Sequence, residues 1–262
     1  MTTSFAKSAA SAAALCGLVL AAGMLSAPAA QAVPLAVVNH SFEADPNNAN
    51  EFYFGDPAGW SLIDNNGIID GGSDVQGTLT VTGSAYFGGS APDGDNVAIL
   101  FIGNDVGGGE VGLGQVLVDV LTAGTTYTLT VDVGNINSGP TQQFGNFDLS
   151  GFPGYRIELL AGGSLLTSLS EGIDAPIGEG VFDERELVFT PGAAHAGLLG
   201  QQLEIRLFNL NLTDPAFPGV DLEVDFDNVR LDAAASALSE PAGLLLTLFG
   251  LAGLGAGFAR RR

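Results

Sequence analysis

The stretch Thr126-Tyr127-Thr128-Leu129-Thr130-Val131-Asp132-Val133 alternates polar and apolar side chains without a break. Every second residue of an extended chain projects to the same side, so the apolar side chains share one face and the Thr and Asp side chains share the other. This pattern is typical of a β-strand that buries one face, and β-branched residues reinforce it. We therefore expect residues 126–133 to form a strand that covers a hydrophobic core.

Similar segments recur along residues 33–232, separated by clusters of Gly, Asn and Asp, and none of them sustains a helical period. The segment Ala161–Ser164 lies between two of them and reads as a hairpin turn. About nine strands at this spacing predict one all-β domain over residues 33–232, a sandwich of two sheets. The predicted strands are Gly77–Thr82, Asn96–Ile102, Gly112–Val120, Thr126–Val133, Tyr155–Ala161, Leu165–Ser170, Glu184–Phe189, Leu203–Leu210 and Leu222–Leu231.

Acidic side chains outnumber basic ones in the 262-residue chain, 29 against 8. Residues 33–240 hold all 29 carboxylates but only four basic residues, so their net charge is 4 − 29 = −25. Phosphate binding needs clustered Lys and Arg, which excludes the usual nucleic-acid-binding proteins. Docking of this region on an anionic membrane surface is excluded for the same reason. The four basic residues are Arg156, Arg185, Arg206 and Arg230.

The N-terminal 32 residues have the three parts of an export signal. Lys7 supplies a positive start, Ala9–Leu25 is a run of small and apolar residues, and Ala30-Gln31-Ala32 matches an A-x-A cleavage site. Cleavage after Ala32 leaves no cysteine, because Cys16 lies inside the signal. The sequence therefore predicts an exported protein without disulfides.

The C-terminus carries a second targeting signal. Residues 242–259 are an uncharged run of 18 residues, just long enough to span a bilayer as a helix. The basic residues 260–262 follow, and the positive-inside rule keeps them cytoplasmic. A linker over residues 233–241 joins this predicted transmembrane helix to the sandwich and ends in Ser239-Glu240-Pro241.

This order of short motif, apolar helix and terminal arginines resembles the PEP-CTERM sorting signal of Gram-negative, exopolysaccharide-producing bacteria. Ser239 replaces the first proline of the Pro-Glu-Pro motif, while Glu240 and Pro241 match it. The resemblance implies an exosortase-type transpeptidase as partner. It also implies anchoring in the inner membrane, followed by transfer to the cell surface or the extracellular matrix. The alternative is a plain tail anchor.

Several short motifs of the sandwich domain occur in the order found in galactose-binding-like jelly rolls. They are Val38-Asn39-His40-Ser41-Phe42-Glu43, Trp60, Pro92-Asp93-Gly94-Asp95-Asn96, Ala123-Gly124-Thr125-Thr126-Tyr127-Thr128-Leu129 and Phe226-Asp227-Asn228-Val229-Arg230-Leu231. The domain resembles that superfamily over nearly its whole length. The resemblance implies a jelly-roll β-sandwich, and the superfamily includes carbohydrate-binding modules.

Jelly rolls of this type often hold a structural calcium ion where the first strand meets the last. Glu43 and Asp227 match the positions that supply such ligands, and Asp45 is a looser candidate on the same loop. Asp227 shares parity with Val229 and Leu231, so its side chain is expected to point inward and to need a partner. The alternative to calcium is a hydrogen bond to backbone amides or to an arginine.

No catalytic residue stands out. After Ala32 the only histidines are His40 and His195, lysine is absent, and neither HExxH nor GxSxG occurs. The segment Gly107–Gly112 matches GxGxxG but leads into a predicted strand, whereas a dinucleotide site needs a helix there. A carboxylate pair for glycoside hydrolysis cannot be chosen among 29 acids. We therefore expect a non-catalytic protein, with a glycoside hydrolase as a distant alternative.

Carbohydrate binding is the function that the jelly-roll resemblance favours. Trp60 is the best candidate for stacking on a sugar ring, and Tyr155 with Arg156 is a second candidate; core packing is the alternative for Trp60. Tyr53 and Tyr86 are weaker candidates. The segment 135–152 could place Phe144, Gln142, Gln143 and Asn146 on a rim, or it could be a floppy insertion.

The sequence therefore predicts an exported surface or matrix protein that binds polysaccharide, such as an exopolysaccharide. Its acidic surface favours neutral glycans or contacts mediated by calcium. The alternative is a calcium-stabilised structural protein of the cell surface or biofilm matrix, with no specific glycan ligand.

Overall fold

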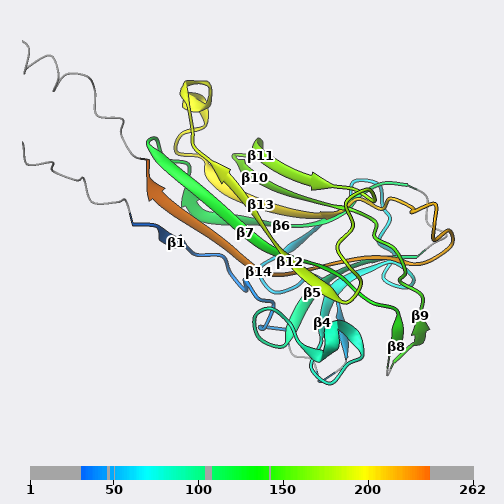
Figure 1. Cartoon of the computed structure of the whole chain (residues 1–262). Helices are drawn as coiled ribbons and strands as arrows, with labels where there is room; N and C mark the ends of the chain where they lie inside the picture. Colours follow the sequence, from blue (N-terminus) through cyan, green and yellow to red (C-terminus); the bar gives the residue numbers. More distant parts are fainter. Residues whose placement is uncertain (1–30, 46–47, 50, 104–107, 142, 237–262) are drawn as a thin grey trace, which may run out of the picture.

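The computed structural model describes residues 31–45, 48–49, 51–103, 108–141 and 143–236. Two antiparallel sheets pack face to face around a hydrophobic core, with almost no helix (Figure 1). The elements are β1 (Val33–Leu35), β2 (Phe52–Phe54), β3 (Ser61–Ile63), β4 (Val75–Thr80), η1 (Tyr86–Gly89), β5 (Asn96–Ile102), β6 (Val111–Val120), β7 (Thr125–Asn135), β8 (Gly139–Thr141), β9 (Gly145–Phe147), β10 (Tyr155–Ala161), β11 (Ser164–Glu171), β12 (Val181–Phe189), η2 (Ala193–Leu198), β13 (Gln202–Asn209) and β14 (Leu222–Ala235), where η marks a 3-10 helix.

The larger sheet has the strand order β12-β7-β14-β5-β4-β2, with β1 pairing along β14. The smaller sheet has the order β11-β10-β13-β6-β3. All nine predicted strands are present, as β4 to β7 and β10 to β14, with ends shifted by a few residues. The prediction of an all-β sandwich is confirmed, and the arrangement is consistent with a jelly roll.

The core between the sheets follows the alternation that the sequence shows. Tyr127, Leu129, Val131 and Val133 of β7 are all buried in it, as expected from residues 126–133. Burying one such side chain completely is worth roughly 1.5–3 kcal/mol, so this face alone accounts for a large share of the strand's stability.

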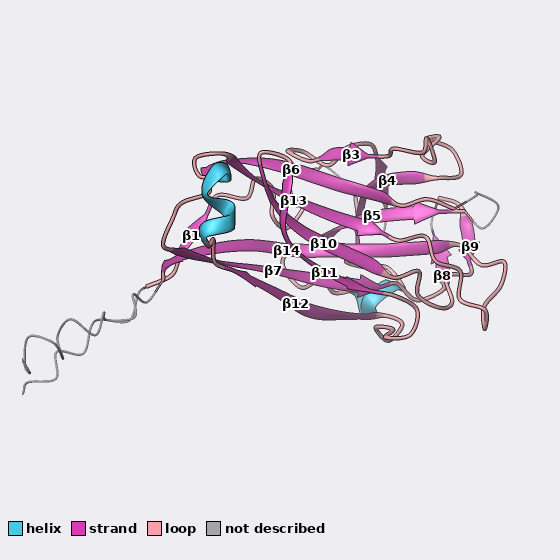
Figure 2. Cartoon of the chain, turned by 90° about the horizontal axis from the view of Figure 1, so that it is seen from above, coloured by secondary structure: helices cyan, strands magenta, loops and turns pink. Residues whose placement is uncertain are grey.

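The larger sheet is also covered on its outer face, over β4 and β5. A second hydrophobic cluster there includes Leu79, Val97, Ile99 and Leu149, and Tyr86 of η1 belongs to it. β5 is therefore buried on both faces, which explains why its residues Val97 to Ile102 form an unbroken apolar run. The β8–β9 hairpin adds to this cover, at the end of the domain opposite β1 (Figure 2).

The first half of β14 has one apolar and one acidic face. Val224 and Phe226 are buried between the two sheets. Because side chains alternate along a strand, Glu223, Asp225 and Asp227 point to the opposite face, which is the outer face of the larger sheet. All three acids are nevertheless buried, because this part of the outer face is covered.

A β-bulge then reverses the alternation of β14. The register with β7 shifts between Asp227 and Arg230, and Asn228 adopts a positive φ of 51°. One extra residue moves the following side chains to the other face, so Val229 and Leu231 point into the core. The expectation that Asp227 shares a face with Val229 and Leu231 is therefore wrong, although Asp227 is fully buried.

Five strands were not predicted, namely β1, β2, β3, β8 and β9. Each has three residues, which is too short to show an alternating pattern. β8 and β9 form a hairpin inside the segment 135–152, for which the sequence left a rim or a floppy insertion open.

The predicted targeting segments lie almost entirely outside the described residues. Residues 1–30 of the predicted signal peptide and residues 237–262, with the motif Ser239-Glu240-Pro241 and the predicted transmembrane helix, are not described. In the described part of the chain, no helix has the length and apolar character needed to cross a membrane. Export and membrane anchoring therefore stay predictions.

Candidate functional site

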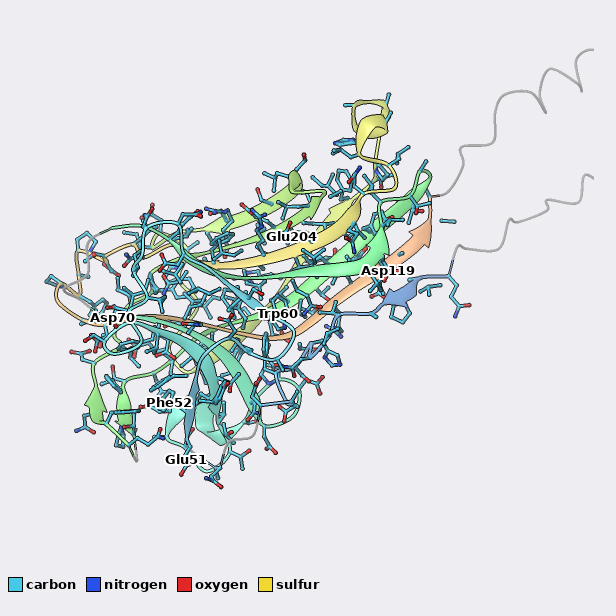
Figure 3. All side chains as sticks on the ribbon, turned by 180° about the vertical axis from the view of Figure 1, so that it is seen from behind. Glu51, Phe52, Trp60, Asp70, Asp119 and Glu204 are labelled. Carbon is cyan, nitrogen blue, oxygen red and sulfur yellow. The ribbon has the colours of Figure 1, made fainter. Side chains whose placement is uncertain are left out.

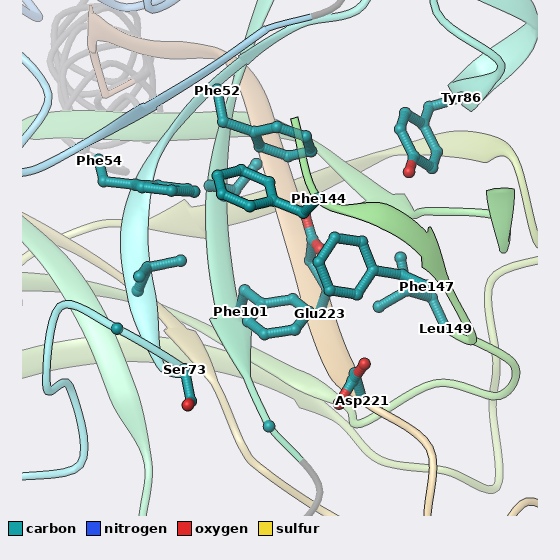
Figure 4. Close-up of a pocket in the computed structure, with 14 residues that line it drawn as sticks. Phe52, Phe54, Ser73, Tyr86, Phe101, Phe144, Phe147, Leu149, Asp221 and Glu223 are labelled. Carbon is teal, nitrogen blue, oxygen red and sulfur yellow. The ribbon is translucent and has the colours of Figure 1, made fainter. Parts of the chain in front are cut away.

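A cavity of about 340 Å³ lies on the outer face of the larger sheet (Figure 4). Strands β2, β4, β5 and β14 contribute to one side of it, and the β8–β9 hairpin covers it from the other. The residues that line it are Phe52, Phe54, Gly72, Ser73, Val75, Tyr86, Ile99, Phe101, Gly103, Phe144, Phe147, Leu149, Asp221 and Glu223.

Five phenylalanine rings contribute to the cavity wall. Phe144, in the hairpin, lies against Phe52 and Phe54 of β2, with ring centroids 6.2 and 5.5 Å apart. Phe147 of β9 meets Phe101 of β5 edge to face at 5.3 Å. Aromatic pairs at these separations are favourable, so the rings that line the cavity also hold the hairpin against the sheet.

Two hydrogen bonds fix the hairpin in addition. The Tyr86 hydroxyl donates to the carbonyl oxygen of Gly139 at 3.2 Å, at the base of the hairpin. The backbone N–H of Phe52 donates to Oε1 of Gln143 at 3.0 Å, near its tip. Burial raises the pKa of Tyr86, with a further contribution from the nearby acids, so its hydroxyl stays a hydrogen-bond donor. These contacts therefore fix the β8–β9 hairpin over the cavity as its roof.

Asp221 and Glu223 are the two acids in the lining of this cavity, and Glu223 is the buried one. Its residue exposure is 4%, and its Oε1 atom has no hydrogen-bond partner. Burial raises the pKa of Glu223 to about 8, and the nearby charge of Asp221 acts in the same direction. Because water does not stabilise the carboxylate, Glu223 is mostly protonated at neutral pH.

Asp225 lies next to Glu223 on the same face of β14. Both of its carboxyl oxygens are buried, and its carboxyl group interacts with that of Glu223. Burial raises the pKa of Asp225 well above its ordinary value, and the neighbouring Glu223 raises it further. Two such neighbouring acids resist ionising together, so the pair retains a proton at neutral pH.

Glu43 and Asp227, two of the predicted calcium ligands, hold the same short segment in front of β5. Oε1 of Glu43 accepts the backbone N–H groups of Asp95 and Asn96 at 2.8 and 2.6 Å. Oδ2 of Asp227 accepts the backbone N–H of Asp93 at 2.8 Å. The structure thus brings the first motif and the last strand together, as the sequence predicted.

Asp45, the third predicted ligand, has different partners. Its carboxylate accepts hydrogen bonds from Nδ2 of Asn39 at 3.2 Å and from the backbone N–H of Ala58 at 3.2 Å. Its backbone carbonyl accepts a bond from Nδ2 of Asn96 at 3.3 Å. Asp45 therefore connects three loop segments beside the Glu43 segment.

The environment of Asp227 is short of positive charge. Burial raises the pKa of Asp227 to about 8, against the effect of two backbone donors, and the carboxylates of Asp93 and Asp132 raise it further. Among the described residues, no group of three or more His, Cys, Asp or Glu side chains is arranged to hold a metal ion. Calcium also takes backbone carbonyl oxygens, so the oxygen donors around Glu43 and Asp227 are of the right chemical type.

The main predicted sugar-binding residues, Trp60, Tyr155 and Arg156, are not in the lining of the cavity. Trp60 is 3% exposed, packs against Phe42 at 5.5 Å and belongs to the core between the sheets. Figure 3 shows Trp60 and the cavity residue Phe52 in separate parts of the domain. The core-packing alternative for Trp60 is therefore the one that the structure shows.

Tyr155 and Arg156 belong to β10 of the smaller sheet. Tyr155 is fully buried and donates its hydroxyl hydrogen to Oε2 of Glu171 at 2.8 Å. Arg156 forms ion pairs with Glu110 and Glu158 at 2.6 and 2.7 Å. Their polar atoms are thus engaged in contacts within the protein.

Sequence reasoning missed most of the cavity. Phe144 and Tyr86 were named only as minor candidates for a sugar site, and both line the cavity. Phe101 and Phe147 were not singled out, because nothing local distinguishes them from core residues. Glu223 had one available signal, the acid on every second position of the strand Leu222–Leu231.

The family model described as HpiC1 cyclase, named HpiC1-like, matches residues 33–232. The apo form of a cyclase from Fischerella sp. is 35% identical, with a TM-score of 0.66, and the match covers 79% of this chain and 98% of that chain. A Stig cyclase from Fischerella sp. TAU, in complex with (3Z)-3-(1-methyl-2-pyrrolidinylidene)-3H-indole, is 36% identical at TM-score 0.66, covering 79% and 100%. A cyclase from Fischerella sp. TAU, in complex with 4-(1H-indol-3-yl)butan-2-one, is 36% identical at TM-score 0.65, covering 79% and 100%. No curated protein matches significantly.

These similarities correct the function expected from the sequence. They indicate a catalytic cyclase, so the expectations of a non-catalytic protein and of polysaccharide binding are wrong. Small-molecule substrates replace polysaccharide and an exosortase-type transpeptidase as the expected partners. The expected roles in a biofilm or surface matrix are wrong for the same reason. A roofed cavity walled by phenylalanine rings agrees with this correction, since it suits a small apolar ligand.

The contacts of Glu43 with the segment 93–96 lead to a prediction about Gly94. Gly94 has φ of +85°, and a Cβ there would lie 2.4 Å from Oε1 of Glu43. We expect Gly94→Ala to destabilise the protein by roughly 2–3 kcal/mol, measured by urea unfolding, from backbone strain and from displacement of Glu43.

Gly163→Ala is the matched control, because Gly163 has φ of +75° with no atom within 4 Å of the added Cβ. It isolates the cost of the backbone conformation. Equal losses for the two variants would contradict the role assigned to Glu43.

Proposed function

This chain belongs to the HpiC1-like cyclase family, and we propose that it closes a ring in a small aromatic substrate, with Glu223 as the proton donor. The observation that carries the proposal is the position of Glu223. A buried, protonated carboxyl group with an unpartnered oxygen lies in the wall of a cavity whose lining includes five phenylalanine rings and Tyr86. A carboxyl group whose pKa lies near the working pH is suited to general acid catalysis.

The substrate class follows from the walls of the cavity and from the relatives. Both ligands named in the related complexes contain an indole ring system. Flat aromatic molecules pack well against phenylalanine rings, and a cavity of about 340 Å³ is in the range that small ligands occupy. We infer that the substrate is a flat, mainly apolar molecule of this kind.

The proposed reaction is an isomerisation, so it needs no second reactant. Glu223 transfers its proton to the substrate, which becomes a cation, while Glu223 becomes a carboxylate. A π bond of the substrate attacks the cationic carbon and forms the new carbon–carbon bond. The substrate then loses a proton to Glu223, which restores the acid and leaves a neutral cyclic product.

The other side chains of the cavity support each of these steps. Phenylalanine faces stabilise a neighbouring positive charge through their quadrupoles. The roof carrying Phe144 and Phe147 limits the access of water, which would otherwise capture the cation. Burial disfavours the carboxylate of Glu223, which favours return of the proton at the end of the reaction.

We propose in addition that a calcium ion binds beside Glu43 and Asp227. The supporting observation is that these two carboxylates hold the segment 93–96 from two sides, with the carboxylates of Asp93 and Asp132 nearby. When bound, the ion supplies positive charge that compensates Asp227. This would fix the start of β5, the strand that carries Ile99 and Phe101 into the cavity.

Replacement of Glu223 tests the proposed acid. Glu223→Gln keeps the size of the side chain but cannot deliver the proton, so we expect kcat to fall roughly 10²–10⁴-fold. The assay incubates indoles that bear alkenyl side chains and detects cyclic isomers of unchanged mass by liquid chromatography and mass spectrometry. Glu186→Gln, at an exposed position of β12, is the control that keeps activity. Full activity of Glu223→Gln would refute the assignment.

The pH profile gives a second test. Only protonated Glu223 donates a proton, so kcat/KM is expected to be flat near neutral pH and to fall about tenfold per pH unit above about 8. The folded-state pKa of Glu223 is raised above its ordinary value of 4.5. The stability that this proton contributes is therefore complete below about pH 4.5 and is lost as the pH rises through 8. A profile that rises through pH 8 would contradict the proposal.

Calcium binding predicts a shift in thermal stability that does not depend on activity. We expect millimolar calcium to raise the melting temperature by roughly 5–10 °C relative to EDTA, because ligands that bind the folded state stabilise it. Asp227→Asn should lose this response, whereas Asp174→Asn, at an exposed loop position, should keep it. A wild-type melting temperature that is the same in calcium and in EDTA would count against the site.

A further inference from the structure

The ionisable carboxyl groups around the cavity have no basic side chain beside them in its lining. Its lining includes two carboxyl groups, Asp221 and Glu223, and Asp225 lies directly behind them on β14. None of the lining residues is Lys, Arg or His. A cavity that combines aromatic rings with carboxyl groups has the chemistry that recognises organic cations.

The arginines of the described chain are occupied elsewhere. Arg156 and Arg206 form ion pairs on the smaller sheet, with Glu110 and Glu158 and with Glu204 respectively. The other two, both in the larger sheet, also bind carboxylates: Arg185 pairs with Glu171 and Asp183, and Arg230 with Glu184. No arginine therefore lies in the cavity wall to oppose a bound cation.

From these observations we propose that the cavity selects flat aromatic molecules that carry a positive charge over neutral molecules of the same shape. This inference rests on the proposed function, because it concerns the same cavity. It goes further in naming the charge of the preferred ligand. The selected class is an aromatic ring system whose cationic nitrogen is part of the ring or conjugated with it.

The aromatic contribution comes from the rings of β2 and of the roof. Phe144 lies within 6.2 Å of both Phe52 and Phe54, so three rings gather at one side of the cavity. Each ring face attracts a cation, and the attraction is largest where water is excluded. A neutral ring of the same shape makes the same apolar contacts but lacks this attraction between a cation and the ring faces.

The carboxyl contribution comes from Glu223. Its Oε1 atom has no partner in the protein, and burial is the main reason that the group holds its proton. A cation in the cavity stabilises the carboxylate and favours loss of that proton. The titratable groups that face Glu223 are Asp221 and Asp225 on its own segment and Tyr86 from η1, and none of them supplies a positive charge. Binding of a cation is therefore coupled to release of a proton. It leaves a cation beside a Glu223 carboxylate, the same pair of charges that the proposed proton transfer to a neutral substrate produces.

The test compares three probes of one bicyclic shape that differ in charge, by isothermal titration calorimetry on the full-length chain at pH 7. N-methylquinolinium is the cation, methylnaphthalene is its neutral isostere, and naphthoate is the anion. We expect N-methylquinolinium to bind about tenfold or more tightly than methylnaphthalene, and naphthoate to bind most weakly. Repeating the titrations in Tris and in HEPES measures proton release, which is expected with N-methylquinolinium alone.

Two variants assign the effect to residues. Glu223→Gln should abolish proton release. Phe144→Leu should weaken binding of N-methylquinolinium by roughly threefold or more beyond its effect on methylnaphthalene, because it removes a ring face but keeps an apolar side chain. Phe144 is 52% exposed, so the variant is expected to fold. Phe217→Leu, at a 41% exposed position outside the cavity lining, is the matched control and should change nothing.

The outcomes separate this inference from the proposed function. Binding of methylnaphthalene as tightly as N-methylquinolinium would overturn the selectivity for cations and leave the cavity as an aromatic substrate site. Failure of all three probes to bind would overturn both the selectivity and the cavity as a binding site. The proton-donor role of Glu223 is tested separately by the isomerisation assay.

Discussion

The burial of three carboxyl groups on one face of β14 is the constraint on which the functional half of this domain depends. Glu223, Asp225 and Asp227 occupy every second position, and each is shielded from water. An unpaired buried charge is costly, so each acid must hold a proton, accept hydrogen bonds or attract a cation. Glu223 and Asp225 take the first course. Asp227 accepts backbone N–H groups and is placed to use the third.

The cover that buries Glu223 also creates the cavity. η1 and the β8–β9 hairpin bring Tyr86, Phe144 and Phe147 over a face of the sheet that would otherwise meet water. The resulting pKa of Glu223 and the exclusion of water from the cavity have the same physical origin. The acid and the apolar binding site are therefore products of one packing arrangement and not of two separate devices.

The sequence predicted the framework well and the site poorly, for reasons that individual residues make clear. Alternation over residues 126–133 is a local signal, and it identified β7 and its buried face. The three-residue strand β2 and the hairpin carry no such signal, although they supply Phe52 and Phe144 to the cavity.

The predicted site residues were misleading for other reasons. Trp60 was a candidate because indole rings often bind sugars, yet its neighbours make it a core residue. The jelly-roll motifs indicated an architecture that hosts many functions, so they could not indicate cyclisation. The bulge at Asn228 also made the predicted orientation of Asp227 wrong, since one extra residue reverses the alternation of side chains along a strand.

The β8–β9 hairpin pairs only with itself in the part of the chain that the structure describes. Its attachment to the domain consists of ring contacts and a few side-chain hydrogen bonds, with no continuous ladder to either main sheet. Insertions, deletions and exchanges in this segment leave the main strand register intact. The volume and outline of the cavity can therefore diverge during evolution, or be redesigned, by changing a single surface segment. The acid on β14 and the sandwich beneath it would be inherited unchanged.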